Sequence, residues 1–178
     1  MFGIGIVLLS HFPFVVKRNK SAQKFNTESF RAGVGAVIYK ADWLVLAFER
    51  SDRSGSWQLP QGGVEHRETL EQALFREIRE ETGLTRDHLT ICLEVPTWMG
   101  YELPLDARSE KTGRGQIHKW FFLEFVGNEA AINLKAGGEF RAWRWSDLRE
   151  LADSAVEFRR PVYSQLVAVA AAKVWQST

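Results

Sequence analysis

The sequence predicts an α+β fold, in which a sheet and a few helices share one hydrophobic core. Two apolar runs, residues 33–39 and 43–48, lie on either side of a short turn, as the two strands of a hairpin do. Residues 70–82 instead follow a helical periodicity between a capping residue and a glycine. The other strand-like and helix-like segments do not alternate regularly, which favours an α+β or α/β/α sandwich.

The composition indicates one globular domain without internal cross-links. The chain has 178 residues, of which 45% are hydrophobic, so it can bury a substantial core. Its 23 basic and 22 acidic residues give a net charge of +1, which excludes proteins that hold nucleic acid by bulk charge but not a local basic groove. The single cysteine, Cys92, excludes an internal disulfide and cysteine-based zinc sites. This cysteine usage fits the reducing cytoplasm, where we expect the protein to reside.

The N-terminal segment differs from the rest of the chain. Residues 1–16 are mostly apolar, but Ser10, His11 and Pro13 interrupt a run that is already too short for a good membrane-spanning helix. Basic residues follow this run, whereas in a secretory signal they precede it. We therefore expect residues 1–30 to be a loosely ordered extension, residues 31–178 to form the domain, and no membrane to be a partner.

Turn signals divide the first half of the domain. The hairpin turn is expected at residues 41–42, and an extended piece at residues 57–60 follows it. Gly62 and Gly63 then indicate a tight turn.

Capping signals bound the next helix. Thr69 is the expected N-cap, Gln72 its capping-box partner, and Gly83 the C-terminal stop of a helix over residues 70–82.

The second half of the chain predicts further strands and two more helices. The strands are expected at residues 89–95, 119–126 and 140–145. Ser146 is the expected cap of a short helix. A last helix is expected over residues 161–175, with Pro161 in its first turn.

The helix over residues 70–82 places carboxylates beside its apolar face. At about 100° per residue, the apolar side chains on one face are those of Leu70, Ala73, Leu74 and Ile78. Glu77 and Glu81 project between them, and Glu80 lies at the edge of the same face. Like charges at this spacing repel, and partial burial raises the cost, so a positive group must compensate.

Hard divalent cations are the group that this face suits, because Mg²⁺ prefers carboxylate oxygens together with substrate phosphates and water. The helix therefore looks like a platform for Mg²⁺, with Mn²⁺ as a substitute, and Arg76 can orient a carboxylate by a bidentate contact. The alternative is a solvated acidic face with ion pairs such as Arg76 with Glu80.

The same segment resembles the Nudix box of the Nudix hydrolases. The family pattern G-x5-E-x7-R-E-U-x-E-E-x-G-U, in which U is aliphatic, is met at each of its nine defined positions, which are Gly62, Glu68, Arg76, Glu77, Ile78, Glu80, Glu81, Gly83 and Leu84. The resemblance implies an α/β/α sandwich with a mixed sheet between helices. It also implies hydrolysis of a nucleoside diphosphate linked to another group. Metal binding would fall to Glu77, Glu80 and Glu81 with help from Glu68, and Gly62 and Gly63 would shape the loop.

The resemblance extends beyond the box to the RNA 5′-pyrophosphohydrolases and the related dinucleoside polyphosphate hydrolases. The segments that carry it are WQLPQGG at residues 57–63, YELP at residues 101–104, the residues around Lys119, EFRAWRW at residues 139–145, and FRRPVY at residues 158–163. In these relatives the position of Glu139 is a metal ligand or a candidate base. The position of Tyr101 is associated with dinucleoside polyphosphate substrates.

Several residues of these segments are candidates for binding a nucleotide or an RNA 5′ end. Phe158 could stack on a base, and the charged forks of Arg31 and Arg50 could hold phosphates. Tyr101, Lys119 and Arg159 could line the phosphate path. The alternative to substrate binding is ordinary core packing for Phe158. For Arg31 and Arg50 it is a position at a solvated strand end.

The resemblance implies a metal-dependent hydrolase that acts on the 5′-triphosphate of RNA, by attack of water on phosphorus. Pyrophosphate, or phosphate in steps, would be released. The alternatives are a dinucleoside polyphosphate such as Ap4A, another Nudix activity on sugar nucleotides or oxidised nucleotides, and a non-catalytic sensor. The catalytic candidates are Arg76, Glu80, Glu81 and Glu139, and the general base stays open among the three glutamates. The oligomeric state is left open as well.

The three-carboxylate face generates a first prediction. Glu80→Gln should keep the fold and sharply lower turnover, because a neutral amide is a poorer partner for a divalent cation; the loss of repulsion should leave stability unchanged or slightly higher. Turnover at saturating Mg²⁺ and thermal unfolding are the measurements. Full activity of the variant would contradict the role of Glu80, and an unfolded variant would make the cluster structural.

Overall fold

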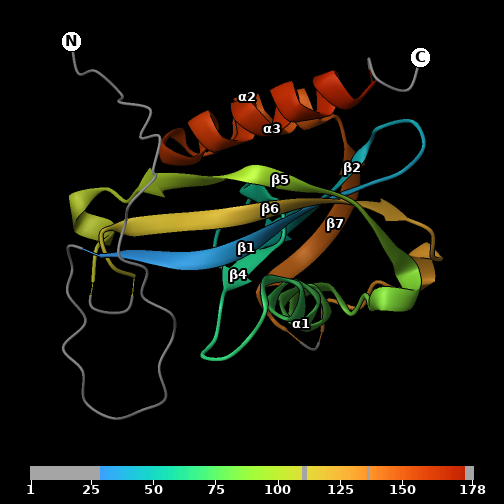
Figure 1. The fold of residues 1–178 in the computed structure, drawn as a ribbon, viewed down its shortest axis with the longest axis horizontal. Helices are drawn as coiled ribbons and strands as arrows, with labels where there is room; N and C mark the ends of the chain where they lie inside the picture. The colour runs from blue at the N-terminus through green and yellow to red at the C-terminus, as the bar shows by residue number, and fades with distance from the viewer. Residues whose placement is uncertain (1–28, 110–111, 136, 175–178) are drawn as a thin grey trace.

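The computed structural model describes residues 29–109, 112–135 and 137–174 (Figure 1). Most of the expected N-terminal extension, residues 1–28, lies outside the described residues. The domain boundary at residue 31 therefore stays a prediction. The first strand begins at Phe30.

Within the described residues, seven strands form one mixed sheet. They are β1 (Phe30–Tyr39), β2 (Val45–Arg50), β3 (Trp57–Gln58), β4 (Gln61–Gly63), β5 (Leu89–Glu102), β6 (Gly115–Phe125) and β7 (Phe140–Ser146). The order is β3-β2-β1-β6-β5, with β4 paired to β1 and β7 paired to β2. The pair β1 with β6 is parallel, and the other pairs are antiparallel. The predicted hairpin is present, since Tyr39 pairs with Val45.

Helices cover both faces of this sheet, which confirms the predicted sandwich. Figure 1 shows α1 (Leu70–Thr82) on one side and α2 (Leu148–Ser154) with α3 (Arg160–Val174) on the other. Alternate residues of β1 and β6 serve the two sides: Phe121 packs with the α1 layer, and Trp120 packs with the α3 layer. Short 3-10 helices, η1 (Arg86–His88), η2 (Leu105–Ala107), η3 (Glu129–Ala131) and η4 (Glu157–Arg159), lie in the connections.

Helix α1 has the predicted bounds because its signals are local. The Thr69 side chain accepts a hydrogen bond from the Gln72 amide, and the Gln72 side chain accepts one from the Thr69 amide, which completes the capping box. Gly83 ends the helix in the left-handed conformation, with φ of 77°.

Two local predictions are wrong. Gly62 and Gly63 do not form a tight turn but lie in β4, paired with β1, and neither has a positive φ. Gly62 is needed for close approach, because a β-carbon there would overlap the carboxylate of Glu77. Ser146 is the last residue of β7, and the N-cap of α2 is Asp147, whose carboxylate accepts from the Arg149 and Glu150 amides.

Several elements extend beyond their predicted limits; β1 already begins at Phe30 and β6 at Gly115. Strand β5 continues past Pro96 because the sheet absorbs the residue in an irregularity between Glu94 and Trp98, where no ladder hydrogen bond is needed from proline. Helix α3 begins at Arg160, one residue before the predicted start. In the part of the chain that the structure describes, no helix is long and apolar enough to cross a membrane.

The parallel pairing of β1 with β6 generates a second prediction. Gly35 lies opposite Trp120, and a β-carbon at Gly35 would come within 2.5 Å of the indole ring, which is fully buried. Gly35→Ala should therefore lower the free energy of unfolding by about 1–3 kcal/mol, as overpacking does. Urea unfolding measures this change.

The control is the double variant Gly35→Ala with Trp120→Phe, because the smaller ring leaves room for the added methyl group. Its loss of stability should be smaller than the sum of the two single losses. If the two losses simply add, the destabilisation by Gly35→Ala does not come from a clash with the Trp120 indole.

Candidate active site

The buried face of α1 carries the carboxylates that the sequence places there. Glu81 is only 5% exposed and lies among Ala73, Leu74 and Ile78 on the buried side of the helix. The side chain of Glu77 is 14% exposed, and that of Glu80, at the edge of the face, is 53% exposed. The three predicted metal ligands on this helix thus range from buried to exposed.

Arg76 holds this part of the site together. Its Nε and Nη2 donate to the two carboxylate oxygens of Glu68 at 2.6 and 2.8 Å, the predicted bidentate contact. Nη2 also donates to the Gly63 carbonyl oxygen at 2.8 Å, and Nη1 donates to Glu77 at 2.8 Å and to Glu80 at 3.5 Å. Glu68 and Glu77 raise the pKa of the guanidinium, which therefore keeps its charge beside them.

A second group of charges surrounds Glu81. The Gln61 amide donates to Glu81 Oε2 at 3.2 Å, but burial raises the pKa of Glu81 well above its usual range, and the negative charges of Glu139 and Glu77 add to the shift. Arg50 Nη1 lies 3.3 Å from Glu139 Oε1, so the arginine and the distant glutamate of the sequence prediction do meet.

A divalent cation fits the chemistry of this region. The buried Glu81 is short of positive charge, and the surrounding carboxylates offer hard oxygen donors, which Mg²⁺ and Mn²⁺ prefer. Within residues 29–109, 112–135 and 137–174, however, no three acidic, histidine or cysteine side chains already converge on one point. Arg76 holds Glu68 and Glu77, and the more exposed Glu80 and Glu139 are the side chains with room to move.

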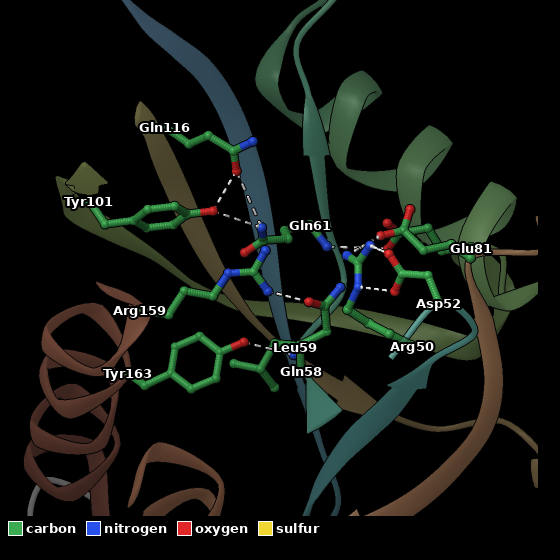
Figure 2. A network of polar contacts seen from close by, with 11 residues as sticks. Arg50, Asp52, Gln58, Leu59, Gln61, Glu81, Tyr101, Gln116, Arg159 and Tyr163 are labelled. Atoms are coloured by element: carbon green, nitrogen blue, oxygen red, sulfur yellow. Dashed lines mark hydrogen bonds and ion pairs between the residues drawn. The ribbon is translucent and has the colours of Figure 1, made fainter. Parts of the chain in front are cut away.

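A network of polar side chains begins on the other side of β4 (Figure 2). The Gln61 side-chain amide donates to the Tyr101 hydroxyl at 3.3 Å and to Gln116 at 3.5 Å, and the Tyr101 hydroxyl donates to Gln116 at 2.5 Å. Gln61 therefore touches the carboxylates through its backbone and this network through its side chain.

Three of the predicted substrate residues lie together beside this network. The rings of Tyr101 and Phe158 are 5.2 Å apart between centroids, and the Arg159 guanidinium lies 5.7 and 5.8 Å from them. Arg159 Nη1 also donates to the Gln58 side chain. Next to Arg159 is a pocket of about 170 Å³, whose lining includes Arg53, Ser54, Ser56, Trp57 and Val156.

The remaining two predicted residues differ in position. Arg31 lies near Glu77, whose charge opposes the lowering of the Arg31 pKa by burial. Lys119 is directed to β5, where its Nζ donates to the Pro96 carbonyl at 2.9 Å and pairs with Glu94 at 3.1 Å. These contacts favour a role for Lys119 in the sheet.

Sequence reasoning missed the polar partners of the site. Asp52, Gln58, Gln61 and Gln116 each hydrogen-bond a candidate residue, and Tyr163 accepts a hydrogen bond from the Leu59 amide. Gln58 and Gln61 belong to the segment at residues 57–63 whose resemblance was noted, so a signal was present. Gln116 and Tyr163 also belong to segments that carry the resemblance, whereas nothing local marks Asp52.

A buried histidine lies beneath Tyr101. The ring centroids of His118 and Tyr101 are 6.1 Å apart, and Nδ1 of His118 is buried with no hydrogen-bond partner in the described part of the chain. Burial, with a smaller effect of the Arg159 charge, lowers the pKa of His118 to about 3. The ring therefore stays neutral in the folded protein.

The sequence is similar to proteins of one known family. A family model described as the NUDIX domain matches residues 29–166. The RNA pyrophosphohydrolase of Rhodospirillum rubrum is 43% identical over 143 residues, which cover 78% of this chain and 86% of that protein. Nudix hydrolase 26, a chloroplastic protein of Arabidopsis thaliana, is 34% identical, over 83% of this chain and 72% of that one.

Solved structures share the fold. The E. coli dihydroneopterin triphosphate pyrophosphohydrolase superposes with a TM-score of 0.62 at 24% identity, over 79% of this chain and 99% of that one. An Ap4A hydrolase from C. elegans, solved as a binary complex, gives a TM-score of 0.60 at 23% identity, over 80% and 98% of the two chains. At this identity the two likenesses concern the fold alone.

The depressed pKa of His118 generates a third prediction. Below the ordinary histidine pKa of 6.5 the unfolded chain binds a proton that the folded protein excludes, so stability should fall as the pH drops from 6.5 toward about 3. His118 should contribute up to about 1.4 kcal/mol per pH unit to this slope. Urea unfolding at several pH values should therefore show a shallower slope for His118→Gln than for the wild type. His66→Gln, at an exposed histidine, is the control, and parallel slopes for wild type and His118→Gln would contradict the assignment.

Proposed function

The chain belongs to the NUDIX family, and on that premise we propose that it removes phosphate groups from the 5′-triphosphate end of RNA in a metal-dependent hydrolysis. Relatives named RNA pyrophosphohydrolase are 36–43% identical to it over 143 residues. Hydrolysis would leave a 5′-monophosphate and release pyrophosphate, or phosphate in steps. The single cysteine and this substrate suit the cytoplasm.

The observation that carries the proposal is the position of Gln61 and β4 between two different surfaces. On one side lie the carboxylates of α1, and on the other lie Tyr101, Phe158 and Arg159 with the adjoining pocket. A triphosphate linked to a nucleobase needs both surfaces, one for the charged chain and one for the aromatic ring.

Carboxylates would hold the cation, and the family generally requires a divalent metal. We assign this role to Glu77, Glu80, Glu81 and Glu139, with Glu68 acting through Arg76, and we propose Mg²⁺ with Mn²⁺ as a substitute. A bound cation would neutralise charge on the polyphosphate and activate water. Arg76 keeps Glu68 and Glu77 in fixed orientations, since its guanidinium donates to both.

Water attack requires a base among the acidic side chains. Glu80, Glu81 and Glu139 are the candidates. Burial raises the pKa of Glu81, and the charges of Glu139 and Glu77 add to this shift, so the three glutamates act as a coupled group and the base is left open among them. No covalent intermediate on the protein is needed, because water itself attacks phosphorus.

Arginines and aromatic rings would bind the substrate. Arg31 and Arg50 lie beside Glu77 and Glu139 and are proposed to contact phosphates. Phe158 is proposed to stack on a base, with Arg159 and Tyr101 beside it. A dinucleoside polyphosphate would use the same groups, so Ap4A is the second candidate substrate.

The substrate class is tested by comparing hydrolysis of 5′-triphosphorylated RNA, Ap4A and ADP-ribose at equal enzyme, with and without Mg²⁺. The proposal requires the fastest Mg²⁺-dependent release from RNA. Faster hydrolysis of Ap4A would move the assignment to nucleotide clearance, and no turnover on any of the three would refute both substrate classes.

Phe158→Ala should raise the KM for triphosphorylated RNA about tenfold, since stacking of one base on an aromatic ring contributes ~1–3 kcal/mol. Phe125→Ala, which removes an aromatic ring near Trp145 instead, controls for loss of packing. Equal effects of the two changes on KM would show that Phe158 does not contact the substrate.

A further inference from the structure

The Arg50 side chain contacts Asp52 as well as Glu139. Asp52 accepts hydrogen bonds from Arg50 Nε at 2.7 Å and from Nη2 at 2.8 Å, so one whole edge of the guanidinium faces this carboxylate (Figure 2). Only Nη1 is directed to Glu139, at the longer distance of 3.3 Å. The position of the charge on Arg50 is therefore set mainly by Asp52.

The backbone that carries this pair is tied down on both sides. Arg50 is the last residue of β2, at an irregularity in the pairing with β7, and its amide donates to the Ser56 carbonyl at 3.0 Å. The Ser51 amide donates to the Glu139 carbonyl at 2.8 Å.

The turn beyond Asp52 is anchored as well. The Gly55 amide donates to Glu49 at 2.6 Å, and Arg141, itself paired with Glu49, donates to Ser54 Oγ at 2.7 Å. Asp52 thus extends from an anchored turn, and an exposed ion pair that is bidentate and preorganised in this way is the kind that contributes measurably.

The orientation of Arg50 matters because two carboxylates lie near its guanidinium. Both Glu139 and Glu81 act electrostatically on the guanidinium. An arginine that turned its fork fully onto these carboxylates would neutralise the charge that a divalent cation needs. Asp52 occupies the edge that would otherwise be available for such a contact.

We propose that Asp52 is a positioning residue that holds Arg50 away from a full contact with Glu139 and Glu81, and so preserves the affinity of these carboxylates for a divalent cation. The inference rests on the proposed function, because that proposal assigns Glu81 and Glu139 to the metal. It concerns a residue outside the family pattern and predicts an effect on cation binding before any substrate is present.

Direct binding of Mn²⁺, measured by electron paramagnetic resonance without substrate, tests the proposal. Asp52→Asn keeps the shape of the side chain and removes its charge, and it should weaken Mn²⁺ binding about three- to fivefold, the size expected for an exposed charged pair. Asp52→Glu, which retains a carboxylate, should recover part of the affinity. Asp42→Asn, at an exposed aspartate paired with Lys40, should leave Mn²⁺ binding unchanged.

The decisive comparison repeats Asp52→Asn in an Arg50→Ala background. If Asp52 acts through Arg50, the second substitution should have no further effect on Mn²⁺ affinity there. The same weakening in both backgrounds would mean that Asp52 attracts the cation directly, and no weakening in the wild-type background would mean that the pair is an ordinary surface contact. Either result overturns the proposal.

The outcome is independent of the substrate. A protein that hydrolyses none of the three test substrates but shows the Arg50-dependent loss of Mn²⁺ affinity would refute the proposed function and retain the role of Asp52. Thermal unfolding of each variant verifies folding, and Asp52→Ala serves as a second charge-removing variant if Asp52→Asn does not fold.

Discussion

The guanidinium of Arg76 is the contact on which the rest of the site depends. The Arg76 side chain is only 17% exposed, and its guanidinium hydrogen-bonds Glu68, Glu77 and the carbonyl oxygen of Gly63. One side chain thereby joins helix α1, the loop that precedes it and strand β4. Because β4 is held so close to the helix, the position facing Glu77 has no room for a side chain and is a glycine, Gly62. The same closeness brings the Gln61 amide to Glu81.

The sheet separates two kinds of chemistry that a nucleotide hydrolase must bring together. The α1 side carries charge, in the form of carboxylates with compensating arginines. The α3 side carries neutral amides and aromatic rings around a single guanidinium, that of Arg159, as its contacts with Gln58, Tyr101 and Phe158 illustrate. Strand β4 is only three residues long, so the two surfaces meet within one short segment of chain. A short element suits this purpose, because its backbone groups are not all used by neighbouring strands.

Local signals made helix α1 predictable to the residue, whereas the contacts of the site depend on residues far apart in the chain. Thr69, Gln72 and Gly83 act on their immediate neighbours, and the periodicity of α1 correctly identified Glu81 as buried. The turn predicted at Gly62 failed because the reason for that glycine is a carboxylate fifteen positions later. The pair of Gln58 with Arg159 joins β3 to η4, and no spacing rule connects them. Lys119 was chosen by resemblance, and only the fold reveals its contacts with β5.

The parallel pairing of β1 with β6 also affects how the chain folds while it is being synthesised. Phe30 pairs with Gly115 and Tyr39 pairs with Glu124, so β1 emerges from the ribosome long before its central partner. Until then the growing chain contains β1, β2 and the acidic helix without the strand that completes the middle of the sheet. Contacts this distant in sequence form slowly. The side of β1 that carries Val37 stays uncovered longest, because the helices that pack on it, α2 and α3, are synthesised last.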